Sequence, residues 1–365
     1  MTNYIDEFRD KVVMQKIVER LCTYSGRNIK IMEVCGTHTM AISRLGLRSL
    51  LPKSIELLSG PGCPVCVTPT SYIDSATELA DNKDIIVTTF GDMMRIPGNE
   101  STLLYKKAKG CNVQMVYSPL NAVDLARENP NKEVVFLSVG FETTTPVIAL
   151  SVYKAKSEGI KNYSVLTANK TMPEAIKTLA GDEELAIDGF IYPGHVCAII
   201  GTDFFSYLSY NMEKAGVVAG FEPLDILYSI NTLVKNITED NYILENMYSR
   251  IVKKEGNIKA QQKVFEIFEP NDAVWRGIGM IPNSGMGLRD EYEKFDAAKK
   301  FNIKLKVSPE PKGCLCGEVL KGKKRPSDCK LFKTRCTPEN PVGACMVSSE
   351  GTCAAYYKYG DGQIS

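Results

Sequence analysis

Residues 134–157 read VVFLSVGFETTTPVIALSVYKAKS, and this stretch decides the fold class. It begins with Val134–Val139, an apolar run of the length of a buried strand. A short polar segment follows, and Pro146–Ser157 then has the character of a helix. A second apolar run, Tyr163–Ala168, comes shortly afterwards. Strand, helix and strand at this spacing predict a unit in which the two strands are parallel.

The same alternation extends to both sides of this stretch. Further strands are predicted at Ile29–Val34, Ile55–Leu58, Ile85–Thr89, Val113–Tyr117, Phe190–Tyr192 and Val217–Gly220. Further helices are predicted at Asp6–Leu21, which Asp6 would cap, and at Ser71–Ala80, Pro119–Glu128 and Met172–Ala180. The order predicts an α/β fold with mainly parallel sheets. The tripeptide Gly-Phe-Glu follows a predicted strand at 140–142 and again at 220–222, which hints at two related halves.

Composition narrows the class of protein. The 365 residues suggest two or three domains, with 44% hydrophobic residues, 24% charged residues and a formal net charge of +1. This balance gives no reason to expect nucleic acid or a membrane as partner. The first ten residues lack the apolar core of a signal peptide, so we expect a cytoplasmic protein. In a reducing cytosol, the twelve cysteines favour metal binding or redox chemistry over structural disulfides.

The strongest chemical signal is a C-terminal array of six cysteines with the spacing C-x-C-x12-C-x6-C-x8-C-x7-C. Its members are Cys314, Cys316, Cys329, Cys336, Cys345 and Cys353. Four thiolates hold a 4Fe–4S cluster, and the two that remain could form a redox-active disulfide beside it. Structural zinc is the alternative, although the paired C-x2–4-C motifs of zinc knuckles are absent. The glycine-rich stretch at 275–287 before the array reads as irregular.

Several reactive side chains follow predicted strands. Cys35 and His38 come directly after Ile29–Val34, and Cys63 and Cys66 form a C-x-x-C pair after Ile55–Leu58. His195 and Glu142 also follow predicted strands. The three cysteines and two histidines are the sort of donors that suit iron. Ligands of parallel sheets bind outside the carboxyl ends of strands, so we expect these residues to converge on one cleft. Buried packing cysteines and a satisfied surface histidine are the structural alternative.

Taken together, these segments resemble the HypD family over nearly the whole chain. The matching blocks are CGTHT at 35–39, GPGCPVC at 60–66, FGDMMRIP at 90–97, GFETTTP at 140–146, YPGHV at 192–196, WRG at 275–277, EYEKFDA at 291–297, CTP at 336–338 and GTCAAYY at 351–357.

The resemblance implies a maturation factor that assembles the Fe(CN)2CO centre of nickel–iron hydrogenase. Its partners would be a HypC-type chaperone and a HypE-type cyanide donor, and the protein would be a monomer when free. The implied fold has two similar α/β domains with mainly parallel sheets around a cleft, plus a small iron–sulfur domain. We expect the first domain at residues 42–150 and the second at 151–270. Residues 1–41 and 271–365 would form the third domain.

The resemblance also assigns roles. Cys35 would hold the precursor iron together with a cysteine of the HypC-type partner, and Cys63 and Cys66 would be a redox-active pair in the cleft. His38 and His195 would orient ligands or move protons, with Glu142 in the same site. In the C-terminal array, the 4Fe–4S ligands would be Cys314, Cys329, Cys336 and Cys353. The redox disulfide would be formed by Cys316 and Cys345.

Two other functions are compatible with the same residues. The first is an iron–sulfur-dependent thiol–disulfide oxidoreductase, in which the cluster feeds electrons to the Cys63/Cys66 pair. The second is a zinc-stabilised binding module without redox activity, which would be colourless after anaerobic purification. In contrast to both, the scaffold role implied by the resemblance is the assembly of a metal centre with the help of redox-active thiols. It is not the activity of a conventional turnover enzyme.

Overall fold

Two separate parallel sheets organise the chain in the computed structural model, which describes residues 6–304 and 309–360. The five-stranded sheet has the order β2 (Ile55–Ser59), β1 (Ile29–Glu33), β7 (Gly189–Pro193), β8 (Ala215–Ala219) and β9 (Leu244–Asn246). The four-stranded sheet has the order β4 (Val113–Met115), β3 (Ile85–Thr89), β5 (Glu133–Ser138) and β6 (Tyr163–Thr167). Every pairing within these two sheets is parallel. The predicted α/β class with mainly parallel sheets is therefore confirmed.

Helices cover both sheets. The helices that precede or follow strands of the five-stranded sheet in the sequence are α1 (Lys11–Cys22), α2 (Gly36–Arg44), α3 (Leu47–Leu50), α4 (Pro64–Val67), α9 (Met172–Ala180), α10 (Gly194–Ile200), α11 (Asp203–Asn211) and α12 (Pro223–Thr238). Those nearest the four-stranded sheet are α5 (Thr70–Ala80), α6 (Leu103–Ala108), α7 (Pro119–Glu128), α8 (Thr145–Ser157), α13 (Ile258–Ile267) and α14 (Ala297–Lys300). The predicted first helix begins later than expected, because Asp10 rather than Asp6 caps it and the 3-10 turn η1 (Asp6–Arg9) precedes it.

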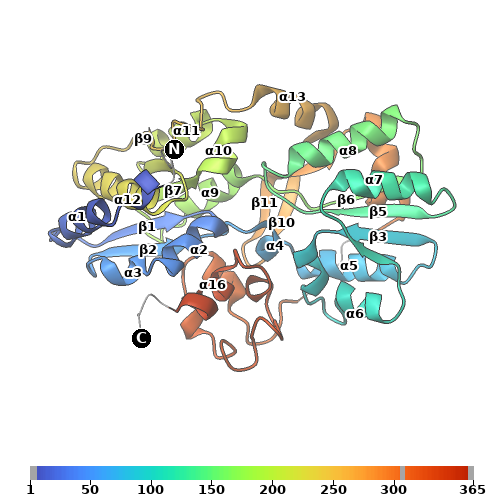
Figure 1. Ribbon diagram of the computed structural model, residues 1–365, viewed down its shortest axis with the longest axis horizontal. Helices are drawn as coiled ribbons and strands as arrows, with labels where there is room; N and C mark the ends of the chain where they lie inside the picture. The colour runs from blue at the N-terminus through green and yellow to red at the C-terminus, as the bar shows by residue number, and fades with distance from the viewer. Residues whose placement is uncertain (1–5, 305–308, 361–365) are drawn as a thin grey trace.

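A two-stranded antiparallel hairpin and a cysteine-rich segment complete the molecule. The hairpin pairs β10 (Phe268–Trp275) with β11 (Gly279–Leu288), so the stretch that reads as irregular is a strand. The remaining short elements are η2 (Gly91–Arg95), η3 (Asp290–Phe295), α15 (Cys316–Leu320), η4 (Pro326–Asp328), η5 (Ala344–Met346) and α16 (Thr352–Tyr359). Figure 1 shows the hairpin and α4 between the two sheets, with the cysteine-rich segment in red beneath them.

The two sheets share one strand order. Numbered within each sheet, both run second, first, third, fourth, and the larger sheet adds a fifth strand. This shared order agrees with two similar α/β units. The Gly-Phe-Glu repeat does not mark equivalent places, however, because the first copy follows the third strand of its sheet and the second copy follows the fourth.

Both sheets include strands from more than one of the domain ranges expected from the sequence. The five-stranded sheet takes β1 and β2 from the first sixty residues and β7 to β9 from residues 189–246. The four-stranded sheet is continuous in sequence between 85 and 167. Strands from different ranges thus pair with one another. The ranges 42–150, 151–270 and 1–41 with 271–365 stay a prediction about folding units.

A shared core joins the parts. One buried cluster contains side chains from the five-stranded sheet, from α4, from the hairpin and from the cysteine-rich segment. Trp275 lies in this cluster, is fully buried and stacks on Phe141 with ring centroids 5.8 Å apart. Cys63, Cys66 and Cys345 lie in the same cluster. The C-x-x-C pair and part of the C-terminal array are thus held in one packed region.

Candidate functional site

Cys35 and His195 meet at the carboxyl edge of the five-stranded sheet. They follow β1 and β7, which are neighbours in the sheet but lie far apart in the chain. Between these two strands the strand order reverses, and such a switch point forms the crevice where parallel sheets bind ligands. The Cys35 sulfur lies 3.9 Å from Nδ1 of His195. The sheet topology therefore brings a thiol and an imidazole to one place.

The Cys35 thiol is nearly inaccessible and is the residue before helix α2. Its side chain is 1% exposed, and burial is the main reason why the pKa of this thiol rises to about 12. Backbone N–H groups of His38 and Thr37 oppose that rise, since they stabilise the thiolate. The free protein therefore holds a protonated thiol, and a metal ion would displace the proton on binding.

Glu33 supports the Cys35 backbone from behind, and sequence reasoning missed it. Its carboxylate accepts hydrogen bonds from the Cys35 N–H at 3.2 Å and from Thr39 Oγ1 at 2.6 Å. Arg48 lies 3.9 Å away. Burial raises the pKa of Glu33 to about 7, against the hydrogen bond from Thr39 and the charge of Arg48. The sequence feature that could have indicated this role is an acidic residue at the end of a buried strand, two positions before the cysteine.

The structure places His38 differently from His195. Its ring is fully buried, and Nε2 lies 2.8 Å from the Gly220 carbonyl oxygen, which fixes Nε2 as the donor. In the described part of the chain Nδ1 has no hydrogen-bond partner. Phe221 packs against both histidine rings, at centroid distances of 4.8 Å and 5.2 Å. Burial lowers the pKa of His38 and of His195 to about 4, so both rings are neutral at pH 7.

The C-x-x-C loop lies directly against Cys35. A Cβ atom added to Gly62 would lie 2.3 Å from the Cys35 Cα, and the Gly36 N–H donates to the Gly62 carbonyl at 3.0 Å. Cys63 caps α4, where its sulfur accepts the Cys66 N–H at 3.3 Å. The two cysteine motifs are therefore in backbone contact, as the predicted convergence requires.

The thiols continue from the C-x-x-C pair into the C-terminal array. Cys66 is fully buried, and its thiol donates to the Ala344 carbonyl oxygen at 3.9 Å. Burial raises the pKa of this thiol, and the nearby Cys345 thiol opposes the rise. The Cys345 sulfur in turn lies 2.9 Å from that of Cys316, which is closer than non-bonded sulfurs pack but longer than a disulfide. The neighbouring Cys316 thiol is the main reason why the pKa of Cys314 is raised. Buried sulfur atoms thus connect α4 with the cysteine-rich segment.

All six C-terminal cysteines line one small cavity, which also has the apolar walls Leu315, Val319, Leu331, Phe332 and Met346. Thiols are the donor set that iron–sulfur clusters use, so the residues present fit such a group. Within residues 6–304 and 309–360, no three or more His, Cys, Asp or Glu side chains are already arranged to hold a metal ion.

Glu142 does not join Cys35. It lines a separate pocket of about 300 Å³ whose other walls are largely apolar and come from α9, α10, α13 and the hairpin. Oε1 accepts the Met172 N–H at 2.8 Å, whereas Oε2 is buried without a partner in the described part of the chain. Cys197 is fully buried and lies close enough to both Glu142 and Cys35 to interact with them electrostatically.

Replacement of Glu142 by Gln tests the ionisation of this carboxyl. Burial raises its pKa from 4.5 to about 7, so the folded protein binds the proton more tightly than the unfolded chain. Stability contributed by the protonated group is complete below pH 4.5 and is lost as pH rises toward 7. We expect the stability of Glu142→Gln relative to wild type to increase by about 2 kcal/mol between pH 5 and pH 8. Urea titrations at both pH values measure this, and a pH-independent difference would contradict it.

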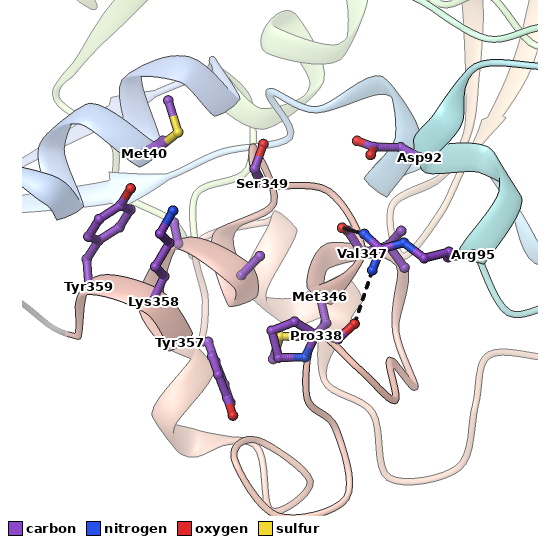
Figure 2. A pocket seen from close by; sticks show the side chains of 12 residues that line it. Met40, Asp92, Arg95, Pro338, Met346, Val347, Ser349, Tyr357, Lys358 and Tyr359 are labelled. Carbon is purple, nitrogen blue, oxygen red and sulfur yellow. Dashed lines mark hydrogen bonds between the residues drawn. The ribbon is translucent and has the colours of Figure 1, made fainter. Parts of the chain in front are cut away.

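A surface pocket of about 500 Å³ lies between α2, η2 and the cysteine-rich segment. Figure 2 shows Met40 of α2 on one side, Asp92 and Arg95 of η2 on the other, and Ser349 between them. Arg95 donates to the carbonyl oxygens of Pro338 and Val347, which ties η2 to the cysteine-rich segment.

Glu350, adjacent to this pocket, was also missed by sequence reasoning. Its carboxylate accepts a hydrogen bond from Thr37 Oγ1 at 2.8 Å. Its backbone packs so closely on Gly36 that a Cβ there would lie 2.6 Å from the Glu350 carbonyl oxygen. The C-terminal segment thus reaches the residue next to Cys35. The sequence feature that could have indicated this contact is the run SSEGTC, which ends at Cys353.

Comparison with known proteins identifies the family. The family model described as HypD, hydrogenase formation hypA family, matches residues 11–360. The chain belongs to the HypD family. It is 44% identical to hydrogenase maturation factor HypD2 of Bradyrhizobium diazoefficiens, over 98% of this chain and 97% of that protein. It is 44% identical to HypD of Cupriavidus necator, over 98% and 97%, and 42% identical to HypD of Escherichia coli, over 98% of each chain.

One structural likeness carries no weight for this HypD-family chain. A conserved domain protein from Vibrio cholerae aligns at 10% identity with a TM-score of 0.14, over 75% of this chain and 99% of that one. Family membership makes the protein a hydrogenase maturation factor. Among the helices in the described residues, none has both the length and the apolar character needed to cross a membrane.

Proposed function

We propose that this HypD-family protein is the scaffold on which the Fe(CN)2CO centre of nickel–iron hydrogenase is assembled. Cys35 holds the precursor iron jointly with a HypC-type chaperone, and a HypE-type protein delivers cyanide. The observation that carries the proposal is the buried Cys35 sulfur, 3.9 Å from a neutral His195 ring at the switch point of the sheet. A soft thiolate and an imidazole are donors suited to iron.

The surroundings of Cys35 support iron bearing diatomic ligands. The site is desolvated, and both histidines near it are neutral, so no positive charge competes with a metal ion. A thiolate donor makes iron electron-rich, which favours cyanide and carbon monoxide as ligands. The pocket beside Glu350 and Met40 offers the chaperone a surface next to α2.

The Cys63/Cys66 pair supports release of cyanide from its carrier. If cyanide arrives as a thiocyanate on a partner cysteine, its sulfur–carbon bond must receive two electrons. The two thiols supply them by forming a disulfide, which yields one carrier thiol, one cyanide ion and one proton. Cys345 lies close to Cys66, and the Cys316 sulfur lies 2.9 Å from that of Cys345. Exchange with these two thiols would return the Cys63/Cys66 pair to the dithiol and leave the disulfide between Cys316 and Cys345.

The cysteine-lined cavity is the proposed site of the resident 4Fe–4S cluster. Cys314, Cys329, Cys336 and Cys353 would hold it, and Cys316 and Cys345 would form the neighbouring redox disulfide. When bound, the cluster supplies single electrons. The contact between Cys316 and Cys345 supports this division of the six cysteines, because these two sulfurs are already adjacent.

Infrared spectroscopy of the complex tests the scaffold function. The chain is produced together with the HypC-type and HypE-type proteins, and the complex with the HypC-type protein is purified without oxygen. We expect bands in the cyanide and carbonyl stretching region, where protein groups do not absorb. An iron-containing brown complex without these bands would contradict the scaffold function.

A thiol–disulfide oxidoreductase is the second candidate, and the buried sulfur contacts from Cys66 through Cys345 to Cys316 favour it. Such an enzyme would reduce a disulfide substrate catalytically without any partner protein. Anaerobic turnover by the isolated chain, together with a silent infrared spectrum, would select this function over the scaffold.

A further inference from the structure

The loop from Cys329 to Cys336 has an apolar side and a positively charged side. Leu331 and Phe332 line the cysteine-lined cavity, together with the two cysteines that bound the loop. The charged residues of the loop are instead exposed at the surface, and they are Lys330, Lys333 and Arg335. One short stretch of chain thus forms a wall of the cavity and presents three cations to solvent.

These three cations belong to a strongly basic part of a nearly neutral chain. Residues 309–336 contain eight Lys and Arg but only three Asp and Glu, whereas the whole chain has a net charge of +1. Some of the eight are neutralised by carboxylates, as Lys321 is by Glu318 and Arg325 is by Glu56. The three cations of the loop have no ion-pair partner in the described part of the chain. Their charges are therefore free to attract an acidic partner.

Two aromatic rings connect this surface with the cavity. The Lys333 ammonium lies 5.6 Å from the ring centroid of Phe332 and 6.0 Å from that of Tyr357. The two rings meet edge to face, with their centroids 6.3 Å apart. Phe332 lines the cavity of the six cysteines, and Tyr357 lines the surface pocket shown in Figure 2. A protein docked at Lys333 would thus be separated from the cavity by a single ring.

The proposed chemistry requires electrons from outside the chain. Thiol exchange after the release of cyanide leaves a disulfide between Cys316 and Cys345. Two electrons and two protons return this disulfide to two thiols. Because an iron–sulfur cluster accepts and passes on single electrons, an external one-electron donor has to deliver an electron twice for each disulfide.

We propose that the loop 329–336 is the docking surface for this donor, an acidic protein that carries a flavin or an iron–sulfur cluster. The inference rests on the proposed 4Fe–4S cluster and its neighbouring disulfide. Complexes between electron-transfer proteins are small and transient, so a few charges at the contact are enough to steer the encounter. The cations of the loop attract the donor, and the thin wall formed by Phe332 keeps the distance for the electron short.

The rate of cluster reduction in the full-length protein tests the inference. The donor is reduced acidic flavodoxin, whose blue semiquinone reports each electron that it gives up in anaerobic stopped-flow mixing. Lys330→Glu, Lys333→Glu and Arg335→Glu together reverse the charge of the loop. We expect the second-order rate constant to fall about tenfold or more at low ionic strength, and the difference to shrink when salt screens the charges.

Binding of labelled flavodoxin is a second readout that does not need the cluster. Because docking depends on the surface charge, we expect fluorescence anisotropy to show weaker binding to the triple variant even when the chains carry no iron. Lys330→Glu alone is the substitute if the triple variant does not fold, and we expect a smaller fall with the same dependence on salt. Equal binding by the folded variant and wild type would overturn the docking surface.

Lys11→Glu, Lys16→Glu and Arg20→Glu together form the matched control. These residues are exposed on α1, which Figure 1 shows at the far left, away from the cysteine-rich segment. The control has the same net charge as the loop variant, so we expect it to keep most of the wild-type rate. An equal fall in both triple variants would mean that net charge, not the loop, sets the rate.

Iron and sulfide content separates the docking surface from the proposed function. A wild-type chain that binds neither iron nor sulfide refutes the cluster itself. A loaded chain whose reduction by flavodoxin is equally fast in wild type and in the loop variant refutes only the docking surface.

Discussion

Cys35→Ala is expected to remove all cyanide-ligated iron from the complex with the HypC-type chaperone, while the iron and sulfide of the C-terminal cluster stay at the wild-type level. The physical reason is that Cys35 provides the thiolate at the switch point between β1 and β7. His195 remains in the variant, but a single neutral imidazole does not replace a shared thiolate ligand. The infrared bands of cyanide and carbon monoxide measure the loss.

Cys197→Ala is the control for this variant. Cys197 is equally buried and lies near Cys35, so its replacement removes the same sulfur atom from the same region. We expect the infrared bands to persist in Cys197→Ala. Bands that survive in Cys35→Ala and disappear in Cys197→Ala would assign the iron ligand to Cys197. Bands present in both variants would mean that neither cysteine is the iron ligand.

Gly62→Ala is expected to have the second large effect, through the backbone. The new methyl group would lie 2.3 Å from both the nitrogen and the Cα of Cys35. Neither atom belongs to a side chain that can rotate away, so the GPGCPVC loop and the start of α2 must separate. We expect a loss of stability of about 3 kcal/mol, the upper part of the range for overpacking. Urea unfolding of the purified chain measures it.

Gly181→Ala provides the comparison for Gly62→Ala. Gly181 ends helix α9 with ordinary right-handed backbone angles, and the nearest atom to an added Cβ is 3.6 Å away. The same chemical change is therefore expected to leave stability almost unaltered. If Gly62→Ala unfolded at the same urea concentration as wild type, the close approach of the two cysteine motifs would be wrong.

The pattern of local elements could be predicted from the sequence. Val134–Val139, Tyr163–Ala168 and Ile29–Val34 each fall on a strand, and Pro119–Glu128 and Met172–Ala180 are helices with the predicted bounds. These elements depend on apolar spacing and on caps within a few residues, which the local sequence carries. The hairpin strand Gly279–Leu288 was missed, because four of its ten residues are glycine or proline and the strand is stabilised by its partner.

The candidate site was predictable in part for the same reason. Residues that follow strands of one parallel sheet share an edge, which brings Cys35 to His195 and Cys63 to Cys35. Glu142 follows a strand of the other sheet and faces a different pocket, so convergence on a single cleft was too broad an expectation for it. The chemical roles of all these residues stay predictions.

By itself the sequence determined the α/β class, the family and the set of cysteines and histidines that can bind metal or exchange electrons. Only the tertiary structure decided which of these groups touch. It pairs β1 with β7 across more than a hundred residues, buries His38 against Gly220, and brings the sulfur atoms of Cys316 and Cys345 within 2.9 Å of each other. The reason is physical: propensity and hydrophobic period act over a few residues, whereas the partners of a buried polar group are chosen by the packing of the whole chain.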